Sequence, residues 1–225
     1  MDAVLLVFAK VPRPGDVKTR LTPVLTPAEA ARLYEAFLTD ALALYDTLDV
    51  AVRLYLAPPL PDDRPSWVPD GIPVRGQEGT GLGARMLQAF RDAFDDGYDR
   101  PVVVGTDHPT LPAAFVRQSF AALEAPCSLC IGPSADGGFY LLGMTDPYPQ
   151  LFEGMSYSHD SVFADTLARI GTTDAQPTVL PRWYDVDTPA ALHRLINDLS
   201  DATVPAECTR AVVQDLARHE LAPSE

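Results

Sequence analysis

The segment from Lys10 to Arg20 is the part of this sequence whose residue types best suit ligand binding. It follows an apolar run at residues 3–8 that is typical of a strand, and two prolines and a glycine exclude a helix through its middle. Its cations are Lys10, Arg13, Lys18 and Arg20, in a chain whose formal net charge is −14. A basic loop at the end of a strand is typical of a phosphate site, although the cations could instead balance nearby acids.

Two other predicted strands are followed by aspartates. Asp107 comes directly after the apolar run 102–104, and Asp185 and Asp187 follow a weaker strand pattern at 179–180. Open α/β sheets bind ligands at the carboxyl ends of their strands, so these carboxylates are expected to face the basic loop. Such a layout suits Mg²⁺ or Mn²⁺ bridging protein and phosphate oxygens.

We expect Asp107 and Asp187 to be the metal ligands, with Asp185 as the rival of Asp187. Each of the pair also has a structural interpretation. Asp107 could cap the turn before Pro109, and Asp187 could simply precede a helix whose N-cap is Thr188. The combination of both carboxylates with the basic loop favours the metal site.

A third motif surrounds Asp136, Gly137 and Gly138. The adjacent glycines allow a close backbone approach, and Asp136 could present its carboxylate to a sugar hydroxyl. An Asp-Gly pair between two strands is also a strong hairpin signal, so both interpretations stay open. His108 adjoins Asp107 and could touch the substrate, although a lone histidine beside proline is often structural.

Composition excludes some classes of function. With 17 Lys and Arg against 31 Asp and Glu, sequence-independent binding to nucleic acid is not expected. The first residues carry no basic region of a signal peptide, and no apolar run approaches the length of a membrane span. We therefore expect a soluble, cytoplasmic protein.

Strand and helix patterns alternate along the chain. Strands are expected at 3–8, 50–56, 72–74, 102–104, 127–131, 139–142 and 179–180; helices are expected from the Thr26 capping box to Leu44, at 82–94, 115–123, from a Ser158 cap to Gly171, at 190–199 and at 206–217. This alternation predicts an α/β fold with an open, mostly parallel sheet and helices on both faces. We expect residues 1–225 to form a single domain.

The motifs together resemble a known bacterial family. They are Phe8-x-Lys10-x-Pro12-x-Pro14-Gly15-x-Val17-Lys18-Thr19-Arg20-Leu21, Gly105-x-Asp107-x-Pro109, Gly132-Pro133-x-x-Asp136-Gly137-Gly138 and Asp185-Val186-Asp187-Thr188-Pro189. Their order is similar to that of the DUF2064, or glycosyltransferase A-like, family within the nucleotide-diphospho-sugar transferase superfamily. The resemblance implies a GT-A-type fold, a nucleotide bound by the N-terminal half, and a divalent metal.

Two reactions are compatible with these motifs. The family label and the Asp136 loop favour glycosyl transfer from a nucleotide-diphospho-sugar to an unidentified acceptor. The basic loop also resembles that of the 2-phospholactate guanylyltransferases, and the pair Lys18 and Arg20 suits a pyrophosphate leaving group, which favours nucleotidyl transfer to a phosphorylated acceptor. We place glycosyl transfer slightly ahead. A nucleotide-binding module without turnover is the third hypothesis, and the presence of Lys18, Arg20 and Asp107 disfavours it.

The candidate site residues form four groups. Catalytic candidates are Lys18, Arg20 and Asp136; candidates for binding the nucleotide or its phosphates are Lys10, Pro12, Gly15, Lys18, Arg20, Gln77 and Gly83; candidates for binding substrate are His108, Asp136, Gly137 and Gly138; and the candidate metal ligands are Asp107 and Asp187.

Overall fold

The computed structural model describes residues 2–220 of the chain. Its strands are β1 (Ala3–Ala9), β2 (Ala51–Leu56), β3 (Val74–Gly76), β4 (Arg100–Val104), β5 (Ser128–Pro133), β6 (Phe139–Met144) and β7 (Gln176–Val179). They form one sheet in the order β3-β2-β1-β4-β6-β5-β7. Strand β6 runs antiparallel to β4 and β5, and the other neighbouring strands pair in parallel.

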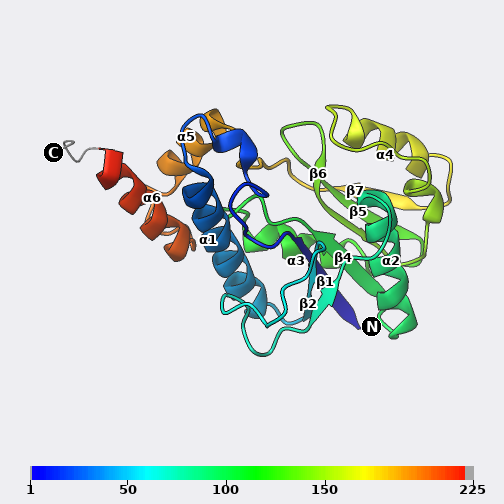
Figure 1. Cartoon of the computed structure of the whole chain (residues 1–225). Helices are drawn as coiled ribbons and strands as arrows, with labels where there is room; N and C mark the ends of the chain where they lie inside the picture. The colour runs from blue at the N-terminus through cyan, green and yellow to red at the C-terminus, as the bar shows by residue number, and fades with distance from the viewer. Residues whose placement is uncertain (1, 221–225) are drawn as a thin grey trace.

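Helices cover both faces of this sheet (Figure 1). They are α1 (Pro27–Asp46), α2 (Leu82–Asp95), α3 (Ala113–Ala121), α4 (Val162–Ile170), α5 (Pro189–Asp198) and α6 (Glu207–Glu220), with short 3₁₀ turns η1 (Thr19–Leu21) and η2 (Pro149–Leu151). One hydrophobic core joins α1, α3, α5 and α6 to one face, and a second joins α2 and α4 to the other. The predicted fold class is therefore confirmed.

Local sequence explains the two best-defined elements near the basic loop. Residues 4–9 of β1 are all buried and alternate between the two cores, as expected for a central strand of a parallel sheet. Helix α1 begins with a capping box: the Glu29 backbone N–H donates to Thr26 Oγ1 at 3.3 Å, and the Thr26 N–H donates to Glu29 Oε2 at 2.7 Å. The chain between them is thereby fixed at both ends.

Three predicted elements have clearly wrong boundaries. Strand β7 covers Gln176–Val179 rather than residues 179–180. Strand β3 starts at Val74, because Ile72 instead closes a turn, donating its backbone N–H to Pro69 O at 3.1 Å, and buries its side chain in the core. Ser158 does not cap a helix. It has φ 69°, and α4 begins at Val162 with Ser161 as its N-cap residue. An additional turn separates Ser158 from the helix: His159 Nε2 donates to the Ser156 carbonyl, and His159 Nδ1 accepts the Ser161 N–H.

The turn between β5 and β6 packs tightly against the segment before α4. Gly137 in this turn has φ 93°, and a Cβ atom there would lie only 1.9 Å from the backbone oxygen of Asp160. The Phe163 N–H also donates to Gly137 O at 2.8 Å. Only glycine allows this approach, which fixes the loop at residues 157–160 against the turn.

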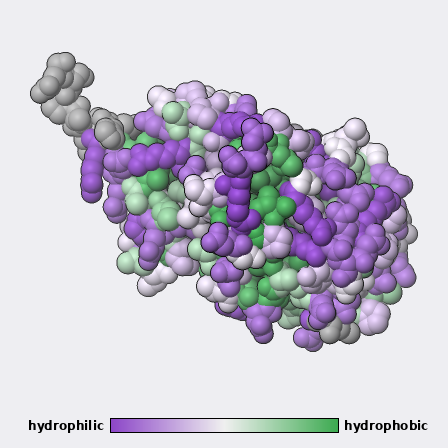
Figure 2. Space-filling model, turned by 60° about the horizontal axis from the view of Figure 1, so that its bottom comes forward, coloured by the Kyte–Doolittle hydropathy of each residue, from purple (hydrophilic) through white to green (hydrophobic). Residues whose placement is uncertain are grey.

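The face of the molecule in Figure 2 is mostly hydrophilic. In Figure 2, hydrophobic residues gather mainly in a central band on the visible face, and hydrophilic residues cover most of the rest. Within residues 2–220, the structure contains no helix with both the length and the apolar character needed to cross a bilayer.

The close approach at Gly137 yields a stability prediction. Gly154 also has a positive φ, 63°, but a Cβ atom there would meet nothing within 4 Å. Gly154→Ala should therefore cost only the backbone strain, about 1–2 kcal/mol. Gly137→Ala should cost clearly more, because the 157–160 loop must also move. Urea unfolding of both variants measures the difference, and equal losses would contradict the packing described for this turn.

Candidate active site

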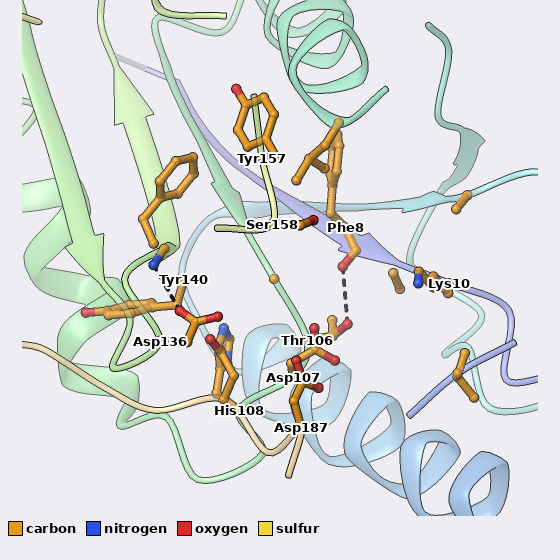
Figure 3. Close-up of a pocket in the computed structure, with 18 of the residues that line it drawn as sticks. Phe8, Lys10, Thr106, Asp107, His108, Asp136, Tyr140, Tyr157, Ser158 and Asp187 are labelled. Carbon is orange, nitrogen blue, oxygen red and sulfur yellow. Dashed lines mark hydrogen bonds between the residues drawn. The ribbon is translucent and has the colours of Figure 1, made fainter. Parts of the chain in front are cut away.

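A cleft of about 740 Å³ opens at the carboxyl ends of the parallel strands. It extends from the loop after β1 to the β5–β6 turn and the loop at residues 157–160, as Figure 3 shows. The chain proceeds from β1 to β2 on one side of the sheet and continues with β4 on the other, so the cleft lies at the point where strand order reverses. Its volume falls within the usual range for small-molecule sites.

The basic loop is shaped to direct one cation inward. Gly15 adopts φ 87° in a turn that the Asp16 N–H closes on Arg13 O at 3.1 Å. Val17 and Leu21 are buried on either side of Lys18, which adopts the left-handed conformation with φ 50° and ψ 34°. The Lys18 side chain is consequently only 2% exposed.

The Lys18 ammonium lies between the two predicted metal ligands. Its Nζ donates to Asp187 Oδ1 at 2.8 Å and also to Asp107 Oδ1. The two carboxylates keep 46% (Asp107) and 37% (Asp187) of their side-chain surface exposed, so they also face the cleft. We call these three side chains the charge centre. The predicted convergence of the basic loop on Asp107 and Asp187 is present in the structure.

Electrostatics keeps two members of the charge centre, Lys18 and Asp107, ionised. Burial by itself would lower the pKa of Lys18, but the attraction and hydrogen bonds of Asp107 and Asp187 outweigh it, and the pKa is raised. Burial would likewise raise the pKa of Asp107, but Lys18 outweighs that effect, and the pKa is lowered. Both groups are therefore charged at neutral pH.

Asp187 reaches the charge centre through the segment before α5. The Val186 N–H donates to Asp107 O at 2.7 Å, and Trp183 forms a parallel bridge with Ser134. Thr188 then caps α5 by accepting the Ala191 N–H at 3.2 Å, as expected from the sequence. Asp187 is thus held by its neighbours on both sides.

Tyr34 and Thr106 support the charge centre, although no sequence pattern singled them out. The Lys10 N–H donates to the Tyr34 hydroxyl at 3.1 Å, and this hydroxyl hydrogen-bonds Thr106 Oγ1 at 2.8 Å. Thr106 in turn donates to Phe8 O at 3.2 Å, which makes Tyr34 the donor to Thr106. This chain of bonds joins the loop after β1 to the end of β4.

A different carboxylate, Asp185, lies beside the charge centre. It accepts a hydrogen bond from Ser134 Oγ rather than from Lys18. Burial raises the pKa of Asp185 to about 7, and the carboxylates of Asp107, Asp136 and Asp187 add to this effect against the Ser134 hydrogen bond. Of the two rivals, Asp187 is therefore the one that shares the ammonium with Asp107.

Asp136 both shapes its turn and lines the cleft. Its Oδ1 accepts the Gly138 N–H at 2.9 Å, within the antiparallel hairpin of β5 and β6. Its side chain also lies on the cleft wall, near His108 in Figure 3. The two interpretations of this motif are therefore compatible in the structure.

His108 is buried at the cleft wall, 3% exposed, with its ring edge-on to Tyr140 at a centroid distance of 5.6 Å. Neither ring nitrogen has a hydrogen-bond partner in the described part of the chain. Burial lowers the pKa of His108 to about 4, so the ring is neutral at physiological pH.

The other predicted residues divide into two groups. Lys10, Arg20, Gln77 and Gly138 line the cleft, whereas Pro12, Gly15, Gly83 and Gly137 do not. The Gln77 amide nitrogen donates to the Ala9 and Tyr55 carbonyls at 3.2 and 2.9 Å, which joins β1 to β2. Gly83 instead allows α2 to pack on the Tyr157 ring, where a Cβ would lie 2.8 Å from a ring carbon.

Arg85 is a further cation on the cleft wall that the sequence analysis missed. It lies in the first turn of α2, and its Nε donates to Gly79 O at 3.3 Å. Its position after a glycine-rich loop, at a helix N-terminus, was the available signal.

The charge centre fits a small divalent cation. Two carboxylates already share one cationic group, the ammonium, and carboxylate oxygens are the ligands that Mg²⁺ prefers. Across residues 2–220 no group of three or more His, Cys, Asp or Glu side chains forms an all-protein metal site. The arrangement is therefore of the open kind, in which phosphate and water supply the remaining ligands.

Comparisons with known proteins agree with this fold. A curated 2-phospho-L-lactate guanylyltransferase of Halorubrum lacusprofundi is 29% identical over 182 residues, 80% of this chain and 78% of that protein. The crystal structure of a presumed nucleotide-diphospho-sugar transferase from Desulfovibrio desulfuricans G20 is 33% identical, covers 97% of this chain and 98% of its own, and superposes with a TM-score of 0.89.

A more distant structure shares the fold alone. The 4-diphosphocytidyl-2C-methyl-D-erythritol synthase of Anaerococcus prevotii is 10% identical, with a TM-score of 0.58 over 88% of this chain and 96% of its own. The first two proteins, from Halorubrum and Desulfovibrio, are transferases by name, which confirms the predicted enzyme class. Residues 41–159 match the model of a family described as an uncharacterized protein conserved in bacteria, and this chain therefore belongs to the DUF2064 family.

Proposed function

We propose that this protein is a metal-dependent transferase that binds a nucleotide-diphospho-sugar through its diphosphate. The observation that carries the proposal is the charge centre, in which one buried ammonium joins two carboxylates at the switch point of the sheet. Lys10, Arg20 and Arg85 line the same cleft and add cations for the phosphates. The 33% identical structure from Desulfovibrio supports the choice of a nucleotide-diphospho-sugar.

In this proposal Asp107 and Asp187 hold Mg²⁺ or Mn²⁺. When bound, the cation neutralises charge on the diphosphate leaving group. The Lys18 ammonium cannot stay between the carboxylates while the cation is there, so it turns to the phosphates and donates hydrogen bonds to them. Arg20 and Lys10 orient the same phosphates from the edge of the cleft.

Nucleotidyl transfer is the second candidate. It is favoured by the guanylyltransferase relative, at 29% identity over most of both chains. In that reaction an acceptor oxygen attacks the α-phosphorus of a nucleoside triphosphate, the bond to the bridging oxygen breaks, and pyrophosphate leaves. The same cations would hold the departing pyrophosphate.

A thermal-shift panel of nucleoside di- and triphosphates and nucleotide-sugars, each with Mg²⁺ or Mn²⁺, tests the common part of both candidates. Compounds that stabilise the protein are then incubated with it and analysed by ³¹P NMR. Release of a nucleoside diphosphate from a nucleotide-sugar supports glycosyl transfer, and pyrophosphate release from a triphosphate supports nucleotidyl transfer. No stabilisation by any nucleotide would reject the proposal.

The position of the Lys18 ammonium predicts competition with the metal. Lys18→Met removes the charge from the centre, so Mn²⁺ alone should bind roughly tenfold tighter or more, since the carboxylates lose their built-in counter-ion. Nucleoside diphosphate should bind more weakly even with Mn²⁺ present. Calorimetry measures both affinities. Lys10→Met is the matched control: within residues 2–220 Lys10 forms no salt bridge and acts on Asp107 only from a distance, so metal affinity should change much less than in Lys18→Met. Unaltered Mn²⁺ affinity in Lys18→Met would mean that the ammonium does not occupy a cation position.

Isosteric variants of the three aspartates test which residues bind the metal. Asp107→Asn and Asp187→Asn should each abolish the dependence of nucleotide binding on Mg²⁺. Asp185→Asn should retain it, because Asp185 hydrogen-bonds Ser134 rather than Lys18. Calorimetric titrations with and without Mg²⁺ provide the comparison, and circular dichroism checks the fold of each variant. Loss of the metal effect only in Asp185→Asn would reverse the assignment.

A further inference from the structure

The charged side chains of the cleft are separated by sign. All four cations that line it come from the β1 loop and α2: Lys10, Lys18, Arg20 and Arg85. Five of its six carboxylates come from other segments, at Asp107, Asp136, Asp160, Asp185 and Asp187; Asp16 is the exception. We call the lining of the β1 loop and α2 the cationic side of the cleft. A nucleotide diphosphate fits the cationic side, which leaves the other segments for the rest of the substrates.

Three of these carboxylates form no salt bridge within residues 2–220, whereas Asp107 and Asp187 both pair with Lys18. We call Asp136, Asp160 and Asp185 the carboxylate wall. Asp136 is bonded to the Gly138 N–H and Asp185 to the Ser134 hydroxyl, both neutral donors. No Lys or Arg among residues 2–220 lines the cleft on this side. The charge centre does not compensate the wall, because Lys18 is already engaged with Asp107 and Asp187.

His108 supplies an independent observation beside the carboxylate wall. The ring is 3% exposed and lies at the cleft surface, yet both nitrogens lack partners in the described structure. An unpaired buried polar group costs free energy that a bound ligand can recover. Ring nitrogens of histidine bond to a donor or an acceptor, and a hydroxyl group can serve as either.

We infer that the carboxylate wall and His108 bind an uncharged polyhydroxy group and disfavour a phosphorylated one. This inference rests on the proposed function, which assigns the nucleotide to the cationic side. Carboxylates accept hydrogen bonds from hydroxyls, and the unpartnered nitrogens of His108 can pair with hydroxyls as well. A phosphate group would bring negative charge against a group of acidic side chains that form no salt bridge in the described structure. This would distinguish the protein from the guanylyltransferase relative, whose name specifies a phosphorylated substrate.

An amine fits less well than a hydroxyl compound. An ammonium group would satisfy the carboxylates, but it has no lone pair to accept the N–H of His108. The polyhydroxy group itself has two possible sources, the sugar of the nucleotide-sugar or a separate acceptor. Both present the same chemistry to the carboxylate wall.

The test compares matched pairs of probes that differ only by a phosphate. Glucose is compared with glucose 1-phosphate, and glycerol with glycerol 3-phosphate, in the presence of Mg²⁺ and inorganic pyrophosphate. Pyrophosphate is used because it should occupy the cationic side whichever nucleotide base the enzyme prefers. It also carries no protons that interfere with saturation-transfer NMR of the probes. We expect at least one neutral probe to bind, and to bind about tenfold tighter or more than its phosphate.

Adding UDP-glucose or GDP-mannose distinguishes the two sources of the polyhydroxy group. Loss of the neutral-probe signal assigns the carboxylate wall to the donor sugar, and retention of the signal assigns the wall to an acceptor.

The double variant Asp136→Asn with Asp185→Asn should lose this preference, because the two amides no longer repel phosphate. The control, Asp62→Asn with Asp63→Asn, removes two charges from the surface loop before β3 and should retain it. His108→Phe, which keeps a ring against Tyr140 without nitrogens, should weaken the neutral probe but not pyrophosphate.

Two results in the unmodified protein would overturn the inference, even if no variant folded. One is binding of a phosphorylated probe as tightly as its neutral partner, and the other is no binding of either neutral probe at the highest soluble concentration. Calorimetry of pyrophosphate binding with Mg²⁺ distinguishes failure of the proposed function from failure of this inference. Failure of pyrophosphate to bind would reject the proposed function, whereas pyrophosphate binding with either of those results would reject this inference alone.

Discussion

The arrangement of the cleft depends on one buried ammonium group. Lys18 donates hydrogen bonds to Asp107 and Asp187, and these three residues come from the loop after β1, the end of β4 and the segment before α5. A buried lysine without such partners would be strongly destabilising, because the cost of removing the charge from water would not be repaid. The charge centre therefore requires all three segments to meet. The conformation of each segment places its charged residue at this meeting point.

The sheet topology makes this meeting possible. Strands β1 and β4 are parallel neighbours, so the residues that follow them emerge at the same edge. The bond from the Tyr34 hydroxyl to Thr106 holds the two loops together from the side of α1. The Val186 N–H then ties the C-terminal segment to the Asp107 carbonyl. The same edge continues past β6 to the β5–β6 turn, so the second half of the cleft adjoins the first.

Much of this could be predicted from the sequence, where the signal is local. The apolar run of β1 and the Thr26 capping box predicted their elements, and the rule that ligands bind at strand ends brought Asp107 and Asp187 together with Lys18. Tertiary contacts were harder to predict. Tyr34 fits the hydrophobic stripe of α1, and nothing in that pattern indicates that its hydroxyl reaches Thr106. The start of β3 and the cap of α4 also depended on partners elsewhere in the chain, as did the salt bridges of the Lys18 ammonium.

A crystal structure with a nucleoside diphosphate and Mn²⁺ would test the central claim most directly. The account predicts an anomalous manganese peak coordinated by Asp107 and Asp187, with the diphosphate beside it and the Lys18 ammonium moved from the carboxylates to the phosphate oxygens. A diphosphate bound elsewhere, or Lys18 still bonded to both carboxylates with manganese at another position, would contradict it.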